Sequence, residues 1–464
     1  MGGAPMMLTA AMIAAATGGT VVSGDPQTMV NGFSIDSRTL QPGDLFFAIV
    51  AARDGHEFVA AALQNGARGA VVSVAPTHSN GALIIRVADT TAALQDLGRF
   101  VRRESQAAVV AITGSAGKTT TKETIAAFLS DHYRVVKNKG NLNNHLGLPL
   151  SLLELRHGAD VAVMELGMNH AGEIRLLVGI AEPEMRVWTN VGDAHLGHFE
   201  SRDAIADAKG EILERARSSD VLVCNADDPL VVARVPRFAG RVIRFGVSRN
   251  AEVRAESVED LGLDGMRFTV ITPGDGARVH TPLLGRGNLL NVLAAIAVAT
   301  QMNVPLRAIV TKCEQLRPAP HRGAVIHLRG VTVLDDSYNS SPTALKRALE
   351  VVARERRPRR KAAVLGEMLE LGVHARQLHE ECGEAAAGSG LARLIAVGGD
   401  AARALADAAM RAGLPAAAVT WTSSSSAAAD AIVPWLAEGD LVLVKGSRGV
   451  KTDIVVERIT EAFS

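Results

Sequence analysis

The segment 109–123, VVAITGSAGKTTTKE, constrains the fold of this chain more than any other. The apolar run 107–113 predicts a buried strand, and a helix is expected to follow it to about residue 130. In the turn between them, Gly114 and Gly117 let backbone N–H groups surround an anion at the start of the helix. A strand, a glycine-rich turn and a helix in this order are typical of phosphate-binding α/β proteins.

This loop is shorter than the common nucleotide-binding pattern G-x-x-x-x-G-K-[ST]. The first glycine of that pattern would fall at position 112, which is Ile112, so the loop reads G-x-x-G-K-T. Lys118 is expected to reach the outer phosphates of ATP, and the Thr119 hydroxyl is a candidate ligand of Mg²⁺. The predicted nucleotide contacts of the loop are Gly114, Ser115, Ala116, Gly117, Lys118, Thr119 and Thr120.

A length of 464 residues suggests about three domains. Short strands mixed with alanine-rich helices predict a small N-terminal α/β domain, residues 1–106. Strand-like runs that alternate with helical stretches predict a central mostly parallel sheet in residues 107–317 and a C-terminal Rossmann-like domain in residues 318–464. Pro318 and Pro320 suit a linker between the last two. The strands are expected at 107–113, 161–165, 186–190, 221–224, 331–335, 362–366, 393–397 and 441–445.

Charge and cysteine content exclude several classes of partner. The chain has 49 basic and 49 acidic residues, so no excess charge favours nucleic acid or an anionic membrane surface. Three widely spaced cysteines predict neither a disulfide framework nor a zinc site. The first residues lack the basic region of a signal peptide, and no apolar run reaches the length of a membrane span. A soluble cytoplasmic protein is expected.

Other polar residues follow apolar strands, where open α/β sheets bind ligands. Glu165 ends the run VAVME and is a candidate carboxylate ligand of Mg²⁺. Asp193 and His195 follow another strand, although single histidines are usually structural. Lys209 lies on a predicted helix, where a lysine is ordinarily a solvated charge.

Asn288 and Asn291 stand three residues apart at a predicted helix start, on one face. Asn288 is interpreted either as the cap of that helix or as a partner of the adenine edge.

The segment VLDDSYNSSP is the richest in candidate residues. Helix capping by Ser340 or Ser341 with Pro342 in the first turn explains its second half. Capping leaves the polar residues before it unexplained, namely Asp335, Asp336, Tyr338 and Asn339.

In chain order, the short loop and the segments NLNNHLGLP, MELGMNHAGEI, NVGDAHLGHF, AKGEIL, GNLLN, HRG and DDSYN resemble the Mur ligases. These ATP-dependent enzymes form the amide bonds of the peptidoglycan peptide. The resemblance runs from about residue 30 to about residue 450 and implies a three-domain, monomeric ligase.

The segments DDSYNSSP, VLGEMLELG and LVLVKGSRG are most similar to the family member that adds D-alanyl-D-alanine to UDP-N-acetylmuramoyl-tripeptide. This implies an acyl-phosphate intermediate and the products UDP-N-acetylmuramoyl-pentapeptide, ADP and phosphate. The alternative is the ligase of the preceding step, which adds diaminopimelate or lysine to the dipeptide. Earlier ligases usually carry histidine at the position of Asn339.

The resemblance also implies residue roles. It makes Lys118, Lys209 and His195 catalytic, with Lys209 carbamylated by CO₂ so that it becomes an anion able to bind Mg²⁺. The implied ligands of two Mg²⁺ ions are Thr119, Glu165, His195 and Lys209. Further nucleotide contacts are Asn288, Asn291, Arg322 and Asp336. The implied contacts to the two substrates are Ser34, Asp36, Ser37, Arg38, Asp54, Gly55, His56, Asn143, Asn144, Tyr338 and Asn339.

Other classes of nucleotide-binding protein have a similar loop, but this chain lacks their further motifs or has segments that argue against them. A nucleotide-driven switch of the GTPase type needs Asn-Lys-x-Asp, and the segment NKGN at 138–141 has no aspartate. Folylpolyglutamate synthase and cyanophycin-type ligases have a similar loop. The N-terminal segment SIDSR with GDLFF argues against both, since it resembles a uridine-nucleotide domain.

Overall fold

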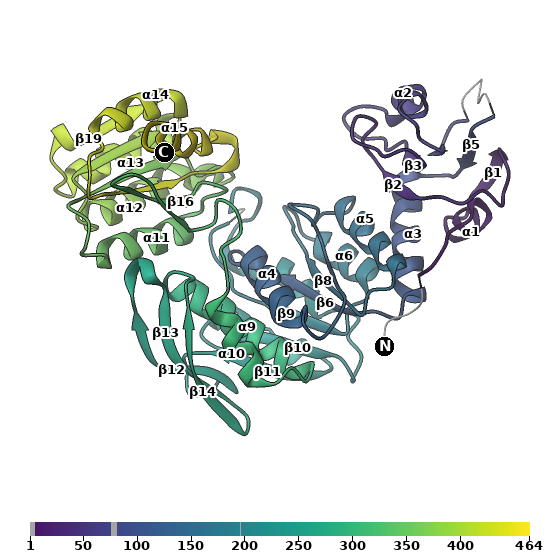
Figure 1. Cartoon of the computed structure of the whole chain (residues 1–464), viewed down its shortest axis with the longest axis horizontal. Coiled ribbons are helices and arrows are strands. Elements are labelled where there is room, and N and C mark those ends of the chain that lie inside the picture. Colours follow the sequence, from purple (N-terminus) through teal and green to yellow (C-terminus); the bar gives the residue numbers. More distant parts are fainter. Residues whose placement is uncertain (1–4, 76–80, 195) are drawn as a thin grey trace.

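The computed structural model describes residues 5–75, 81–194 and 196–464. Three β-sheets follow one another along the chain, and helices pack against each of them (Figure 1). The central sheet lies between the N-terminal and C-terminal sheets, which stand at opposite ends of the molecule. The predicted three-part α/β fold is therefore confirmed.

The N-terminal sheet has the strand order β1-β5-β4-β3-β2. Its strands β5 to β2 are parallel, and only β1 at the edge is antiparallel. The strands are β1 (Thr20–Ser23), β2 (Gly32–Ser34), β3 (Asp44–Phe47), β4 (Gly69–Val72) and β5 (Leu83–Arg86), and the helices are α1 (Ala10–Ala16), α2 (Val59–Gln64) and α3 (Thr90–Glu104).

Helix α3 connects this sheet to the central region. Arg102 near its end is buried, and its Nε donates to the carbonyl oxygen of Ala181 at 2.9 Å. Apolar residues of α3 and of the central helices share one continuous core. The predicted boundary after residue 106 thus lies within a packed region of the structure, and its position stays a prediction.

The central sheet has nine strands in the order β14-β13-β12-β11-β10-β9-β6-β8-β7. Its strands are β6 (Ala108–Thr113), β7 (Val135–Lys137), β8 (Val161–Glu165), β9 (Met185–Trp188), β10 (Val221–Asn225), β11 (Arg241–Gly246), β12 (Val253–Asp260), β13 (Met266–Thr272) and β14 (Asp275–Thr281). Its helices are α4 (Lys118–Leu129), α5 (Gly147–Leu153), α6 (Glu173–Ala181), α7 (Arg202–Gly210), α8 (Pro229–Val232), α9 (Gly285–Gln301) and α10 (Leu306–Glu314).

The parallel strands of this sheet are apolar on both faces because helices cover both. In β6, Val109 and Ala111 contribute to the core with α5 and α6, whereas Val110 and Ile112 contribute to the core with α4 and α9. This explains why the predicted strands appeared as uninterrupted apolar runs.

The hairpins of β12, β13 and β14 are antiparallel and were missed by the sequence analysis. Strand β13 buries alternate side chains, among them Met266, Phe268 and Val270. The alternation of apolar and polar residues, together with the turn residues Pro273 and Gly274, was the sequence signal that could have predicted these hairpins.

The C-terminal sheet has the order β15-β16-β20-β17-β18-β19, in which only β15 is antiparallel to its neighbour. Its strands are β15 (Ala324–His327), β16 (Val331–Asp336), β17 (Arg360–Gly366), β18 (Arg393–Val397), β19 (Val419–Thr422) and β20 (Asp440–Lys445). Its helices are α11 (Pro342–Arg354), α12 (Ala375–Ala387), α13 (Asp400–Arg411), α14 (Ser425–Ile432) and α15 (Asp453–Phe463).

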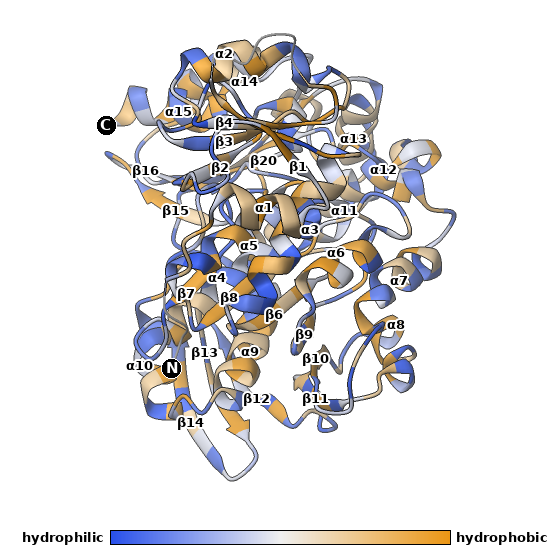
Figure 2. Cartoon of the chain, turned by 90° about the vertical axis from the view of Figure 1, so that its right-hand side faces the viewer, coloured by the Kyte–Doolittle hydropathy of each residue, from blue (hydrophilic) through white to orange (hydrophobic). Residues whose placement is uncertain are grey.

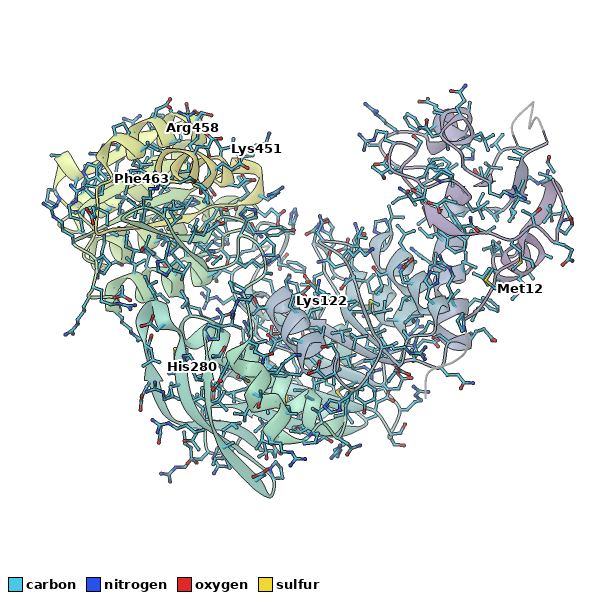
Figure 3. The ribbon with its side chains drawn as sticks, viewed as in Figure 1. Met12, Lys122, His280, Lys451, Arg458 and Phe463 are labelled. Carbon is cyan, nitrogen blue, oxygen red and sulfur yellow. The ribbon has the colours of Figure 1, made fainter. Side chains whose placement is uncertain are left out.

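Helix α11 begins as the sequence predicted. Ser341 is its N-cap, with Oγ accepting from the N–H of Ala344, and Pro342 occupies the first turn. In Figure 2, hydrophobic and hydrophilic residues alternate around outer helices such as α3 and α6, as expected for helices that bury one face. Within the described residues, no helix has both the length and the apolar character needed to cross a bilayer.

Candidate functional site

The glycine-rich loop joins β6 to α4 and packs closely against neighbouring side chains. Gly117 has a left-handed backbone, φ 83°, and a Cβ there would lie 2.2 Å from Oδ1 of Asn291. A Cβ on Gly114 would lie 1.9 Å from Oγ1 of Thr189. Glycine is therefore required at both positions, and the backbone of the loop is left exposed to an anion.

Residues after β9 fix the shape of this loop. The side chain of Asn190 brackets Ala116, accepting from its N–H and donating to its carbonyl oxygen, both at 2.9 Å. Thr189 Oγ1 donates to the same carbonyl oxygen at 2.9 Å. The sequence analysis missed both residues, because their role depends on β9 lying beside β6 in the sheet.

Two predicted metal ligands, Thr119 and Glu165, lie in direct contact. Thr119 Oγ1 donates to Glu165 Oε2 at 2.8 Å, and Asn143 Nδ2 donates to Oε1 at 2.9 Å. Glu165 is only 4% exposed. A hydroxyl and a carboxylate next to a phosphate-binding loop suit Mg²⁺, which takes few protein oxygens and completes its shell with phosphate and water.

Side chains of the described residues do not assemble a full metal site by themselves. Among the described residues, no group of three His, Cys, Asp or Glu side chains could hold a metal ion. His195, the one histidine of the predicted set, lies outside the described residues. The oxygen atoms present nevertheless fit Mg²⁺ that arrives with a nucleotide.

Lys118 and Lys209 lie close enough for the charge of Lys118 to act on Lys209. Lys118 Nζ donates to the carbonyl oxygen of Gly114 at 2.8 Å, and burial lowers its pKa. Lys209, on α7, is 1% exposed and has no hydrogen-bond acceptor in the part of the chain that the structure describes. Burial first, and the charge of Lys118 second, hold the pKa of Lys209 well below its usual value. The interpretation of Lys209 as a solvated helix charge is therefore wrong.

The two asparagines of α9 lie in contact with each other and face α4. Asn291 Nδ2 donates to Oδ1 of Asn288 at 3.1 Å, and Thr121 Oγ1 on α4 donates to Asn291 Oδ1 at 3.3 Å. The capping interpretation of Asn288 is wrong, because α9 begins three residues earlier, at Gly285.

The C-terminal region contributes a second group of side chains. The guanidinium of Arg322 lies 4.1 Å from the ring centroid of Tyr338, a cation–π contact. These residues and the loop line one cavity of about 380 Å³ between the central and C-terminal sheets. The predicted site residues on its wall are Ser115, Ala116, Gly117, Lys118, Thr120, Asn288, Asn291, Arg322, Asp336, Tyr338 and Asn339.

The candidate uridine-binding residues lie in the N-terminal region, and none of them lines this cavity. His56 Nε2 accepts from the N–H of Ser73 at 2.9 Å, so the ring proton is on Nδ1 and is donated to Asp54 at 2.6 Å. Arg38 is paired with Asp36 at 2.7 Å and keeps the pKa of that carboxyl at about 2.

The remaining residues of that group also serve the local fold. Ser34 Oγ accepts from the N–H of Asp36 at 3.1 Å, Ser37 is buried, and a Cβ on Gly55 would lie 2.5 Å from the backbone of Ile49. In the central region, Asn144 Oδ1 accepts from the N–H of Gly147, the first residue of α5, at 2.8 Å. Their contacts to a substrate stay predictions.

Comparison with known proteins shows that the central and C-terminal regions match two family domains in the same order. Residues 112–299 match the Mur ligase middle domain, and residues 321–448 match the family described as Mur ligase, glutamate ligase domain. UDP-N-acetylmuramoyl-tripeptide--D-alanyl-D-alanine ligase of Bacillus subtilis is 33% identical over 440 residues, which is 94% of each chain. The enzyme of the same name from Treponema pallidum is 37% identical over 433 residues, 90% of this chain and 92% of its own.

The chain belongs to the Mur ligase family.

Solved structures of similar proteins have the same overall fold as this chain. A crystal structure of MurF from Acinetobacter baumannii superposes with a TM-score of 0.89 at 32% identity and covers 98% of this chain and 100% of its own. MurF from Thermotoga maritima, in complex with ADP, gives 0.81 at 29% identity over 93% and 98% of the two chains. The similarity thus includes the N-terminal region, which neither family model covers.

One prediction concerns Asn288, which lies on the wall of this cavity and is a predicted adenine contact. Asn288→Ala is expected to raise KM for ATP about tenfold, because it removes an amide worth about 1.5 kcal/mol from the cavity wall. KM for the peptide substrate should stay the same. Initial rates at varied ATP measure the effect, and Asn250→Ala, which changes an exposed asparagine outside the cavity wall, is the control. An unaltered KM for ATP would rule out the adenine contact.

Proposed function

We propose that this Mur ligase joins D-alanyl-D-alanine to UDP-N-acetylmuramoyl-tripeptide at the expense of ATP. The observation that carries the proposal is the cavity, which has the phosphate-binding loop on one wall and Arg322, Asp336 and Tyr338 on the other. The full-length relatives named for this reaction support the choice of substrates. The ligase of the preceding step remains less favoured, since its structural match gives a TM-score of only 0.55 at 21% identity.

The chemistry follows from the weak reactivity of a carboxylate toward an amine. Transfer of the γ-phosphoryl group from ATP to the tripeptide carboxylate gives an acyl phosphate and ADP. The dipeptide amine then attacks the acyl carbon, the C–O bond to phosphate breaks, and inorganic phosphate leaves as the amide forms. Lys118 and the backbone N–H groups of the loop stabilise the charge on the transferred group.

Mg²⁺ would offset the repulsion between the phosphate and carboxylate anions when both are bound. Thr119 and Glu165 are the described residues that would hold it. Glu165 is already oriented by Asn143, whose own segment is predicted to face the peptide substrate.

Lys209 is suited to react with CO₂. Burial and the charge of Lys118 lower the pKa of Lys209, which favours the neutral amine, the nucleophilic form. Attack of Nζ on the carbon of CO₂ forms an N–C bond and releases one proton, which leaves a carbamate anion. That anion would replace repulsion of Lys118 by attraction and would add oxygen ligands for Mg²⁺.

A product assay tests the proposed function. With Mg²⁺, ATP and UDP-N-acetylmuramoyl-tripeptide, the enzyme should release ADP and form a new amide only when D-alanyl-D-alanine is added. Diaminopimelate and lysine with the dipeptide acceptor are the matched alternatives. ATP hydrolysis without a new peptide bond under all three conditions would contradict a ligase function.

We also propose that the protein acts as a monomer in the cytoplasm. All three cysteines are buried and unpaired, which is compatible with a reducing compartment. Its partners would be the two small substrates and ATP, with no nucleic acid.

A further inference from the structure

Strands β16 and β20 end beside each other with opposite charges. They are parallel neighbours, and Asp336, the last residue of β16, is the register partner of Lys445, the last residue of β20. Carboxyl ends of parallel strands are where open α/β sheets bind ligands. Both residues line the cavity that also contains the phosphate-binding loop.

The ammonium group of Lys445 makes two contacts at once. Its Nζ donates to Asp336 Oδ2 at 2.6 Å and to the carbonyl oxygen of Asn339 at 2.9 Å. The Lys445 side chain is only 3% exposed, whereas the Asp336 side chain is 23% exposed. The lysine is thus placed behind the carboxylate, and the carboxylate is the member of the pair that faces the cavity.

The second contact fixes the turn that follows β16. This turn carries Tyr338 and Asn339 to the cavity wall, and Arg322 stacks on the Tyr338 ring. One buried cation therefore links the carboxylate on the nucleotide side to the turn that bears two predicted substrate contacts.

Other charged groups around Asp336 do not replace this lysine. Burial raises the pKa of Asp336, and Lys445 opposes that rise both by its charge and by its hydrogen bond. Arg322 lowers the pKa by charge alone, while the neighbouring carboxylate of Asp335 raises it. Asp335 is itself bound by His321 at 2.8 Å and by Ser337 at 2.6 Å. Among the described residues, Lys445 is the only cation that hydrogen-bonds Asp336.

We propose that Lys445 is a positioning residue of the ligase, which directs the Asp336 carboxylate into the nucleotide cavity and holds the 337–340 turn in place. The inference rests on the proposed function, because it takes Asp336 as a nucleotide contact. The role assigned to Lys445 is exerted through Asp336 and the turn.

The test is the pH dependence of ADP binding to the full chain with Mg²⁺, measured by calorimetry. Lys445→Met should weaken ADP binding about tenfold at pH 8, because Asp336 loses the group that orients it. An ionised Asp336 supports binding above its pKa, and that support is lost as the pH falls through it. Lys445 lowers this pKa by its charge and its hydrogen bond, so its loss should raise the pKa, and ADP binding of the variant should begin to weaken at a higher pH than in the unaltered protein. We call the part of the pH profile where binding weakens the acid limb.

Three further variants make the result specific. Lys445→Arg keeps a cation and should restore most of the affinity and the acid limb. Lys451→Met removes an exposed lysine of the same region and should change neither. The double variant Lys445→Met with Asp336→Asn removes both members of the ion pair, so it should fold and show no acid limb in this range.

A purely structural lysine gives a different outcome. Lys445→Met would then lower the melting temperature while its ADP affinity and acid limb match those of the unaltered protein, and the proposal would be overturned. The proposal would also be overturned if ADP binding by the double variant still weakened at the same raised pH as binding by Lys445→Met. ADP binding needs neither peptide substrate, so it tests the role of Lys445 independently of the ligation assay. If Lys445→Met shifts the pH dependence of ADP binding as expected but no amide forms in the ligation assay, only the proposed substrates are contradicted.

Discussion

Lys209→Ala is expected to lower kcat on the order of 10³-fold while leaving the fold intact. The side chain is buried beside Lys118 and has no acceptor among the described residues, so its removal leaves no hydrogen bond unpaired. What the variant lacks is the amine that can take up CO₂ and become an anion. ADP release with both substrates present measures the loss.

Chemical rescue separates this role from a structural one. A short carboxylate such as formate or acetate can enter the space left by the side chain and supply an anion. We expect it to restore part of the activity of Lys209→Ala and to have no effect on Lys312→Ala, which removes a lysine paired with Asp131 at the surface. Full activity of Lys209→Ala without any added carboxylate would refute the carbamate.

Local sequence patterns predicted most of the fold because they reflect local burial. The run 161–165 is strand β8 with the predicted bounds, since all five of its side chains are buried between two helical layers. The start of α11 was also correct, because Ser341 and Pro342 determine a helix start without help from distant residues. The antiparallel hairpins after β11 were missed because half of each strand is polar and resembles a loop.

The contacts that make the site depend on strand order, which a sequence without an alignment does not reveal. Glu165 meets Thr119 because β8 lies beside β6, and Lys445 meets Asp336 because β20 lies beside β16 although 109 residues separate them. Lys209 is buried because α7 packs on the central region, and nothing in the segment ADAKGEIL distinguishes this from a solvated position. In each of these cases, the contact could be predicted only after segments distant in the sequence had been placed side by side.

Lys118→Met should abolish most activity and yet leave stability unchanged or increased. The ammonium group hydrogen-bonds a neutral carbonyl in the loop, and desolvation outweighs its attraction to Glu165. Its loss deprives the transferred phosphoryl group of a cation, worth about 10²–10³-fold in kcat. The folded protein is meanwhile relieved of a partly desolvated charge that repels Lys209. Steady-state rates and thermal unfolding measure the two effects, and a lower melting temperature would instead make Lys118 a structural residue.

The same substitution gives an independent view of Lys209. Without the neighbouring cation, the pKa of Lys209 should move back toward its ordinary value, because the second cause of its depression is gone while burial remains. Less of the amine is then neutral at a given pH, so the variant should need more CO₂ for its residual rate. Titration of bicarbonate into CO₂-depleted enzyme measures this. An identical CO₂ requirement in both proteins would mean that the two lysines act independently.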